Sequence, residues 1–224
     1  MARPPGLPGR KGGIGITLYL AAALFGIGLA LALGARAKDL GAIELRASWA
    51  FLLAALVEGG LAYGTYRGLF RPEWAGPLAK VLVLLLVGYG LYRNRHLKSL
   101  YLVLCGLLLN TLVILANGGH MPVSLDTLKK AGIEGWEELL KTRADAVHSL
   151  LDESTRLPFL GDVVPLPPLR KAASPGDLFI LGGIAGVVVE GALRAGGRRL
   201  PRRQAALRVL AFLLLVFLLL ALRI

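Results

Sequence analysis

The stretch that decides the fold is residues 99–123, which read SLYLVLCGLLLNTLVILANGGHMPV. Residues 99–116 carry no charged side chain, and a helix that crosses a bilayer core needs about 20 apolar residues. The run ends at Asn117-Gly118-Gly119, a sequence typical of a helix C-cap followed by a turn. We therefore predict a membrane-spanning helix over 99–116, with a change of chain direction directly after it.

Similar apolar runs lie on both sides of this segment, at 14–34, 48–66, 76–92, 177–193 and 205–222. Of the 224 residues, 55% are hydrophobic and 18% are charged, and the mean hydropathy is +0.64. A soluble domain of this size with such a surface would precipitate. We expect an all-α fold, a polytopic transmembrane helical bundle of about six spans. Whether 48–66 spans completely is open, because Glu58 lies near its centre.

The net charge of +12 would suggest nucleic acid in a soluble protein, but here the cations flank apolar runs. Loops at 35–47, 93–98 and 194–204 carry eleven Lys and Arg, against six in the short segments on the other side of the predicted membrane, the 117–175 segment not counted. The positive-inside rule places these loops in the cytoplasm and both termini outside. Arg10 and Lys11 argue for the opposite orientation. We expect anionic lipid head groups as partners of the basic loops, and no nucleic acid.

Three regions follow from this pattern: helices one to four in 1–116, an extramembrane cap in 117–175, and helices five and six in 176–224. In the cap, 124–126 resembles a helix start and Gly132 a helix stop. Apolar residues then recur at helical spacing from 134 to about 152, so we predict two or three short amphipathic helices in the cap, lying on the membrane face or over the mouth of the bundle. Residues 157–169 contain four prolines among apolar residues, so we expect an extended strip packed on the helix ends.

Four separated motifs resemble a bacterial family of multi-pass membrane proteins, the domain of unknown function 5317. They are Arg93–Leu97, the run from Leu109 through Asn117 to Val123, Thr155–Pro167 and Ser174–Asp177, and the likeness extends over about 34–193. The resemblance implies a multi-pass fold in a bacterial inner membrane and no activity, while the positive-inside rule places the cap outside. The family usually shows Arg where His120 stands, which argues against His120 as a catalytic base.

Candidate ligand-binding residues gather in and around the cap: Asn110, Asn117, His120, His148, Arg156, Asp162 and Asp177. Asn110 and Asn117 lie two helical turns apart on nearly one face, where amides usually bond a neighbouring helix. His120 and His148 with Asp162 or Asp177 could form a metal site, but no pair has ligand spacing within one helix. We therefore predict no metal site and no cofactor. For Asp162 we favour a buried pair with Arg156, and for Asp177 the role of helix N-cap.

Inside the predicted spans, Glu58 is the carboxylate to which a function is most readily assigned. Its neighbours Gly59 and Gly60 suggest close helix packing as the competing role. Lys80 is expected to extend toward the membrane surface, and Glu190 either to do the same or to pair with Arg194 at i+4. Gly182, Gly183 and Gly186 are expected to form a packing face. Cys105 is interpreted as a small hydrophobic residue packed between helices.

The sequence contains no Walker loop, nucleophile elbow, His-Glu-x-x-His or paired-cysteine motif. The first hypothesis is a non-enzymatic membrane component or a protein that binds a lipid-like ligand, alone, as an oligomer or with a protein partner. The second is a small proton-coupled transporter that uses Glu58. The third is a membrane enzyme acting on a lipid head group beneath the cap, so catalysis stays open.

Overall fold

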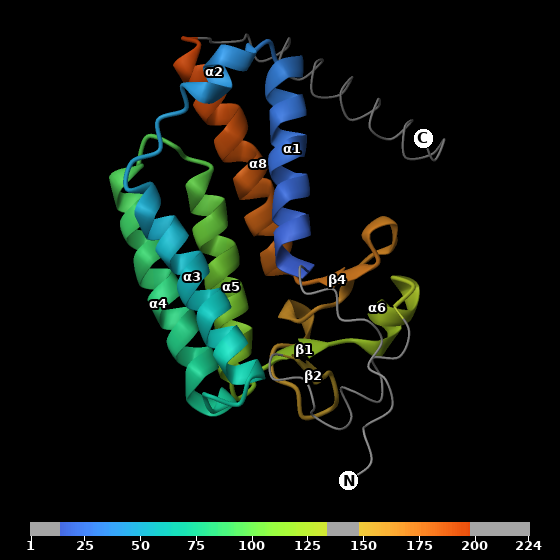
Figure 1. Ribbon diagram of the computed structural model, residues 1–224. Helices are drawn as coiled ribbons and strands as arrows, with labels where there is room; N and C mark the ends of the chain where they lie inside the picture. Colours follow the sequence, from blue (N-terminus) through green and yellow to red (C-terminus); the bar gives the residue numbers. More distant parts are fainter. Residues whose placement is uncertain (1–13, 134–147, 198–224) are drawn as a thin grey trace.

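The computed structural model describes residues 14–133 and 148–197. The structure is mostly helical, and five long helices dominate it (Figure 1). In chain order the elements are α1 (Ile14–Ala32), α2 (Ala37–Gly41), α3 (Ser48–Tyr66), α4 (Pro72–Arg93), α5 (Leu100–Ala116), β1 (Met121–Val123), α6 (Leu125–Lys130), β2 (His148–Leu150), η1 (Pro158–Leu160), β3 (Val164–Leu166), η2 (Pro167–Leu169), β4 (Lys171–Ala173) and α8 (Pro175–Ala195).

The five long helices coincide with five of the six predicted apolar runs, and the run at 205–222 lies outside the described residues. By length and composition, the stretches Trp74–Arg93 and Pro175–Ala195 can each cross a membrane. The apolar stretches Leu18–Ala32 and Leu100–Ala116 are shorter. The described part of the chain therefore confirms a mainly helical fold, with two helices that meet the full length requirement of a span.

The long helices pack in the spatial order α3, α4, α5, α8 and α1, so that α8 joins the N-terminal helix to the middle of the chain (Figure 1). Small residues allow the closest crossings, as Gly106 of α5 faces the backbone of Gly176 and Gly26 of α1 faces Ala185 of α8. Larger side chains fill the other contacts, with Ala54, Val83 and Val87 in one buried cluster.

The glycines divide into packed and open positions. Gly183 and Gly186 contact Val103 of α5 and Ser99, the N-cap of α5, as the predicted packing face requires. A Cβ atom at Gly182, Gly59 or Gly60 would meet nothing within 4 Å among the described residues. Among the described residues, the close helix packing predicted at Gly59 and Gly60 is therefore not found, and Gly182 does not take part in the predicted packing face.

The cap lies at the end of the bundle where α1 and α8 begin (Figure 1). Its centre is β1, which pairs in parallel with β2 and forms a bridge from Val123 to Asp162 on its other side. Ser124 caps α6, and Gly132 ends it with a positive φ of 69°, so both predicted helix signals are confirmed.

Two predictions for the cap need correction, and with them the expectation of an all-α chain. Residues 148–150 form a strand and not the end of a helix, because β1 satisfies their backbone groups. The proline-rich strip is not extended throughout: it folds into η1 and η2, and β3 between them pairs antiparallel with β4. The remainder of the predicted second helix, 134–147, lies outside the described residues.

Candidate functional site

A half-open pocket of about 210 Å³ lies between α1, α3, α4, α5 and α8. Most of its wall is apolar, formed by side chains such as Ala54, Val83, Leu107 and Ile180. The polar residues on the wall are Tyr19, Glu58, Lys80, Asn110 and Thr111. A mainly apolar cavity with a few converging polar groups has the composition that small-molecule sites usually show.

Glu58 of α3 and Lys80 of α4 form an ion pair on this wall. The exposed fraction of the Lys80 side chain is only 21%, against 42% for Glu58. The prediction that Lys80 extends toward the membrane surface is therefore wrong: the lysine turns inward to the carboxylate, since an unpaired charge in an apolar environment is far more costly. The residues are 22 positions apart on neighbouring helices, so no sequence period indicates their contact.

Both charged residues also line a second, smaller cavity of about 50 Å³, which extends toward Gly76 and Gly119 at the cap end of the bundle. The ion pair thus lies on the walls of both cavities.

Asn110 lines the inner cavity from α5 and is held by the start of α8. Its Nδ2 donates to Asp177 Oδ1 at 2.8 Å, and its Oδ1 accepts from Ser174 Oγ at 2.8 Å. Ser174 is the N-cap of α8, and Asp177 occupies the third helical position of a capping box. The predicted N-cap role of Asp177 is therefore wrong by three positions. The amide nevertheless bonds a neighbouring helix, as expected.

Asn117 joins the end of α5 to the loop before η1. Its Oδ1 accepts from the backbone N–H of Arg156 at 2.9 Å, while Nδ2 donates to the carbonyl groups of Arg156 and Val113 at 2.8 Å. Asn117 is the C-cap, and Gly118 and Gly119 follow with φ values of 66° and 94°. These contacts occupy the side chain in capping and fix where the cap begins.

In the cap, Asp162 faces His148, with 3.9 Å between Oδ2 and Nε2. Burial raises the pKa of Asp162 to about 6, although the nearby charge of His148 lowers it, and Asp177 adds to the increase. The expected pair between Arg156 and Asp162 is wrong, because the parallel pairing of β1 with β2 brings His148 to this position. His148 and Asp162 line a cavity of about 130 Å³ together with Arg170 and Lys171.

The metal arrangement considered from the sequence is not assembled. Within 14–133 and 148–197, no three His, Cys, Asp or Glu side chains lie close enough together to hold a metal ion. Of the candidate residues, the structure brings Asn110 and Asp177 together at one point and His148 and Asp162 at another. Asn117 and Arg156 meet through the Arg156 backbone, and His120 follows the Gly118-Gly119 turn.

Comparison with known proteins leads to a family and not to an activity. The model of a family of unknown function, DUF5317, matches residues 42–189. This range contains Glu58, Lys80 and the whole of the cap. Searches of curated proteins and of solved structures found no match.

Proposed function

The chain belongs to the DUF5317 family, and we propose that it is an integral membrane protein that binds a lipid-like ligand in the half-open pocket between its long helices. The observation that carries this proposal is the Glu58–Lys80 ion pair on the wall of an otherwise mainly apolar cavity. Such a cavity provides an apolar environment for a chain and a polar anchor for a head group.

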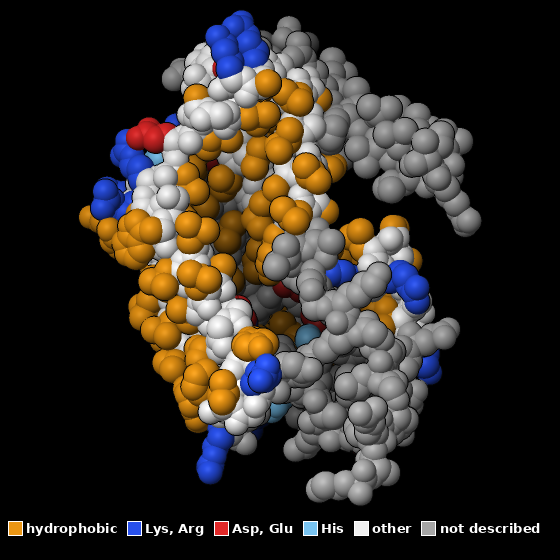
Figure 2. Space-filling view, in the orientation of Figure 1, with side chains coloured by type: hydrophobic (Ala, Val, Ile, Leu, Met, Phe, Trp, Pro, Cys, Tyr) orange, Lys and Arg blue, Asp and Glu red, His pale blue; other side chains and the backbone are white. Residues whose placement is uncertain are grey.

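Exposed apolar side chains support membrane insertion. Leu52 and Leu56 on α3 and Leu85 on α4 are 67%, 70% and 65% exposed, and hydrophobic side chains cover this face of the bundle (Figure 2). Water would oppose this exposure, whereas lipid tails favour it.

Exposed aromatic side chains lie at two heights along the bundle, as they do at the two membrane–water interfaces of membrane proteins. Trp49 and Tyr92 are exposed near one end of the helices, and Tyr63 and Trp74 near the other. From Trp74 to Tyr92 a straight helix rises about 27 Å, close to the thickness of a bilayer core. In this proposal the five long helices cross the membrane together, and the basic loops face the cytoplasm of a bacterial cell.

The cavity constrains the ligand. At about 210 Å³ it is smaller than most pockets that enclose a whole drug-sized molecule, so it accommodates a head group or one end of a chain. The ion pair offers an ammonium donor and a carboxylate acceptor, while Asn110 and Thr111 add neutral polar groups. We therefore expect an uncharged polar or zwitterionic head group.

Native mass spectrometry of gently purified protein, with metal analysis of the same sample, tests the proposal. We expect a stoichiometric lipid-like molecule on the wild-type protein and its loss from a double variant, Glu58→Leu with Lys80→Met. Replacing both charges with apolar groups of similar size leaves no unpaired charge, so the fold should persist. The matched control replaces an exposed ion pair, Asp126→Ala with Lys130→Ala, and should keep the ligand.

A wild-type protein without any retained molecule would contradict the proposal, and so would a double variant that keeps its ligand. A stoichiometric protein partner without a lipid would instead support a role as a subunit of a larger membrane assembly.

Proton-coupled transport is a second candidate, favoured by the position of the Glu58–Lys80 pair between the inner cavity and the cap-end cavity. Protonation of Glu58 would break the ion pair and release Lys80, which lines both spaces. In proteoliposomes, Glu58→Gln should abolish proton-dependent movement of the molecule identified on the wild-type protein. Unchanged movement would exclude Glu58 as the proton carrier.

A further inference from the structure

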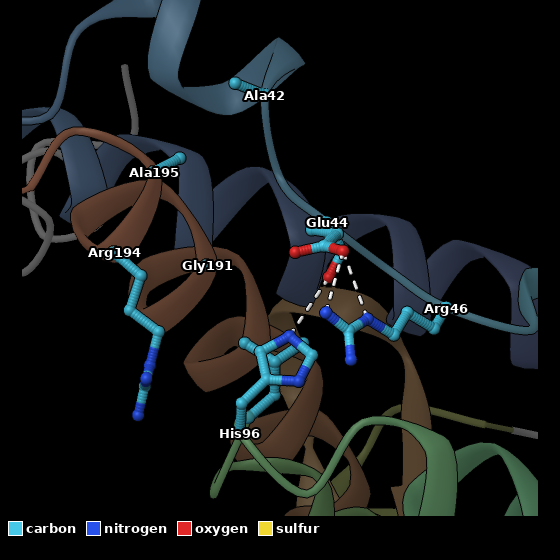
Figure 3. Close-up of a pocket in the computed structure, with 8 residues that line it drawn as sticks. Ala42, Glu44, Arg46, His96, Gly191, Arg194 and Ala195 are labelled. Atoms are coloured by element: carbon cyan, nitrogen blue, oxygen red, sulfur yellow. Dashed lines mark hydrogen bonds and ion pairs between the residues drawn. The ribbon is translucent and has the colours of Figure 1, made fainter.

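A separate pocket of about 370 Å³ lies at the opposite end of the bundle, between the loop after α2, the turn after α4 and the end of α8. Figure 3 shows Arg46, His96 and Arg194 around it. We propose that this pocket binds a phosphate group, supplied by an anionic phospholipid head group or by free phosphate. The lipid source rests on the membrane placement proposed above.

The pocket is built on a fixed frame, because buried contacts hold its loop. Asn94 is fully buried, and its Oδ1 accepts from the Arg46 backbone N–H at 2.8 Å. Its Nδ2 donates to the carbonyl groups of Arg46 and Gly90. On the other side, Ile43 packs against Gly191 of α8, where a Cβ atom would lie 2.7 Å from Ile43 Cγ2. The guanidinium of Arg46 therefore extends from an anchored backbone.

The charges at this end of the molecule favour an anion. Seven Lys and Arg lie at this end of the described chain, against three acids. They belong to the segment from the end of α1 through the loop after α2, to the end of α4 and the turn after it, and to the end of α8. The cations are Arg36, Lys38, Arg46, Arg93, Arg95, Lys98 and Arg194, and the acids are Asp39, Glu44 and Glu190.

Two of these acids are engaged in the protein itself. Asp39 is buried and accepts from the Arg36 backbone N–H at 2.8 Å. Glu190 accepts from both the backbone N–H and the hydroxyl of Ser99, and it pairs with Arg194 at 3.1 Å as the sequence predicted.

Glu44 is the internal competitor for the proposed ligand. Its carboxylate pairs with Arg46 at 3.0 Å, and its side chain is 68% exposed, so it can turn away into water (Figure 3). Its carbonyl group lies 3.3 Å from His96 Nε2, which must donate because a carbonyl only accepts. A phosphate that replaced the Glu44 carboxylate would receive hydrogen bonds from the planar Arg46 guanidinium. Arg194 lines the same pocket and adds positive charge, while its Nε and Nη2 donate to Glu190.

The test uses full-length protein, native mass spectrometry, and phosphatidylglycerol in competition with phosphatidylcholine. We expect the double variant Arg46→Gln with Arg194→Gln to lower the preference for phosphatidylglycerol about tenfold, since charged hydrogen bonds are removed. This double variant should fold, because Asn94 still holds the backbone at position 46 and Ser99 still donates to Glu190. Glu44→Gln should raise the preference by freeing Arg46.

The matched control is Arg93→Gln with Arg95→Gln, the same change of charge at the same end but outside the pocket. An equal loss in this control would overturn the proposal in favour of general surface attraction, and so would unchanged binding in the Arg46 and Arg194 variant. Displacement of phosphatidylglycerol by inorganic phosphate identifies a site for phosphate alone, whereas its retention identifies a lipid site.

The two proposals fail separately. The Glu58→Leu and Lys80→Met variant should keep its preference for phosphatidylglycerol, because the bundle separates its cavity from this pocket. Loss of the inner ligand with retained phosphate binding would support both assignments.

Discussion

At the scale of single residues, Asp162 should make the stability of the cap depend on pH. Its pKa is about 6 in the folded protein, against about 3.9 for an unperturbed Asp. Between these values the folded state holds a proton that the unfolded state has lost, so stability falls as the pH rises from about 4 to about 6 and then levels off. The full difference is on the order of 3 kcal/mol.

We expect Asp162→Asn to unfold at a higher temperature than wild type near neutral pH, and at a similar temperature near pH 4. The bridge to β1 uses only the Asp162 backbone, so it survives the change. Thermal unfolding in detergent across this pH range measures the effect. The control is Asp152→Asn, because hydrogen bonds from Ser154 lower the pKa of that exposed carboxylate. An Asp162→Asn protein with the wild-type pH profile would contradict the assignment.

For the candidate residues, the sequence identified the unusual side chains, but it did not identify the side chains that contact them. Glu58 was identified because a carboxylate in an apolar run is unusual, yet its partner Lys80 was assigned to the membrane surface. Asp162 was assigned to Arg156, six residues away, whereas strand pairing brings His148 to it from the other side of β1. Local spacing cannot show such contacts, since they depend on which elements become neighbours.

At the scale of elements, the crossing of α5 and α8 depends on small residues at particular positions. A Cβ atom at Gly183 would lie 2.6 Å from Val103 Cγ2 and 2.7 Å from the Val103 backbone nitrogen, while one at the adjacent Gly182 would meet nothing within 4 Å. The backbone of Val103 cannot move aside as a flexible side chain can. Substitution by alanine should therefore change the stability of the protein differently at the two glycines.

We expect Gly183→Ala to destabilise the protein by about 1–3 kcal/mol through overpacking. Gly182→Ala should be neutral or stabilise by up to about 1 kcal/mol, because alanine favours a helix over glycine. Chemical denaturation of the purified variants in detergent compares them directly. Equal effects at both positions would show that α8 does not approach α5 through the Gly183 face.

Element boundaries were predictable where the sequence carries an end signal. The run at 48–66 matches α3 at both ends, and Ser124 and Gly132 delimit the region of α6 as predicted. The strands of the cap were not predicted, because each is only three residues long and has no alternating pattern of its own. Such strands form because a partner satisfies their backbone groups.

At the scale of the whole molecule, the exposed apolar face between two aromatic levels makes membrane depth measurable. The chain contains three tryptophans, and Trp49 lies near one end of the bundle. We expect a variant that retains only Trp49 to be quenched most by lipids brominated near the head group. In a variant without native tryptophans, Leu85→Trp should be quenched most by lipids brominated deep in the chain.

Acrylamide, a quencher dissolved in the water phase, serves as the complement to the brominated lipids. It should reach Trp49 more readily than a tryptophan at position 85. Strong acrylamide quenching at position 85, with no quenching by brominated lipid, would contradict insertion of the α4 face. This measurement does not depend on the inner ligand, so it separates membrane placement from ligand binding.

The sequence by itself determined the helices and their apolar character, because these depend on local composition: the uncharged run at 99–116, its C-cap at Asn117, and the capping residues before α6. The order in which the helices pack, the inward turn of Lys80 to Glu58 and the pairing of His148 with Asp162 were decided only by the tertiary structure. The physical reason is that a buried charge or backbone group must find a partner, and the partner is supplied by whichever element lies nearest in space.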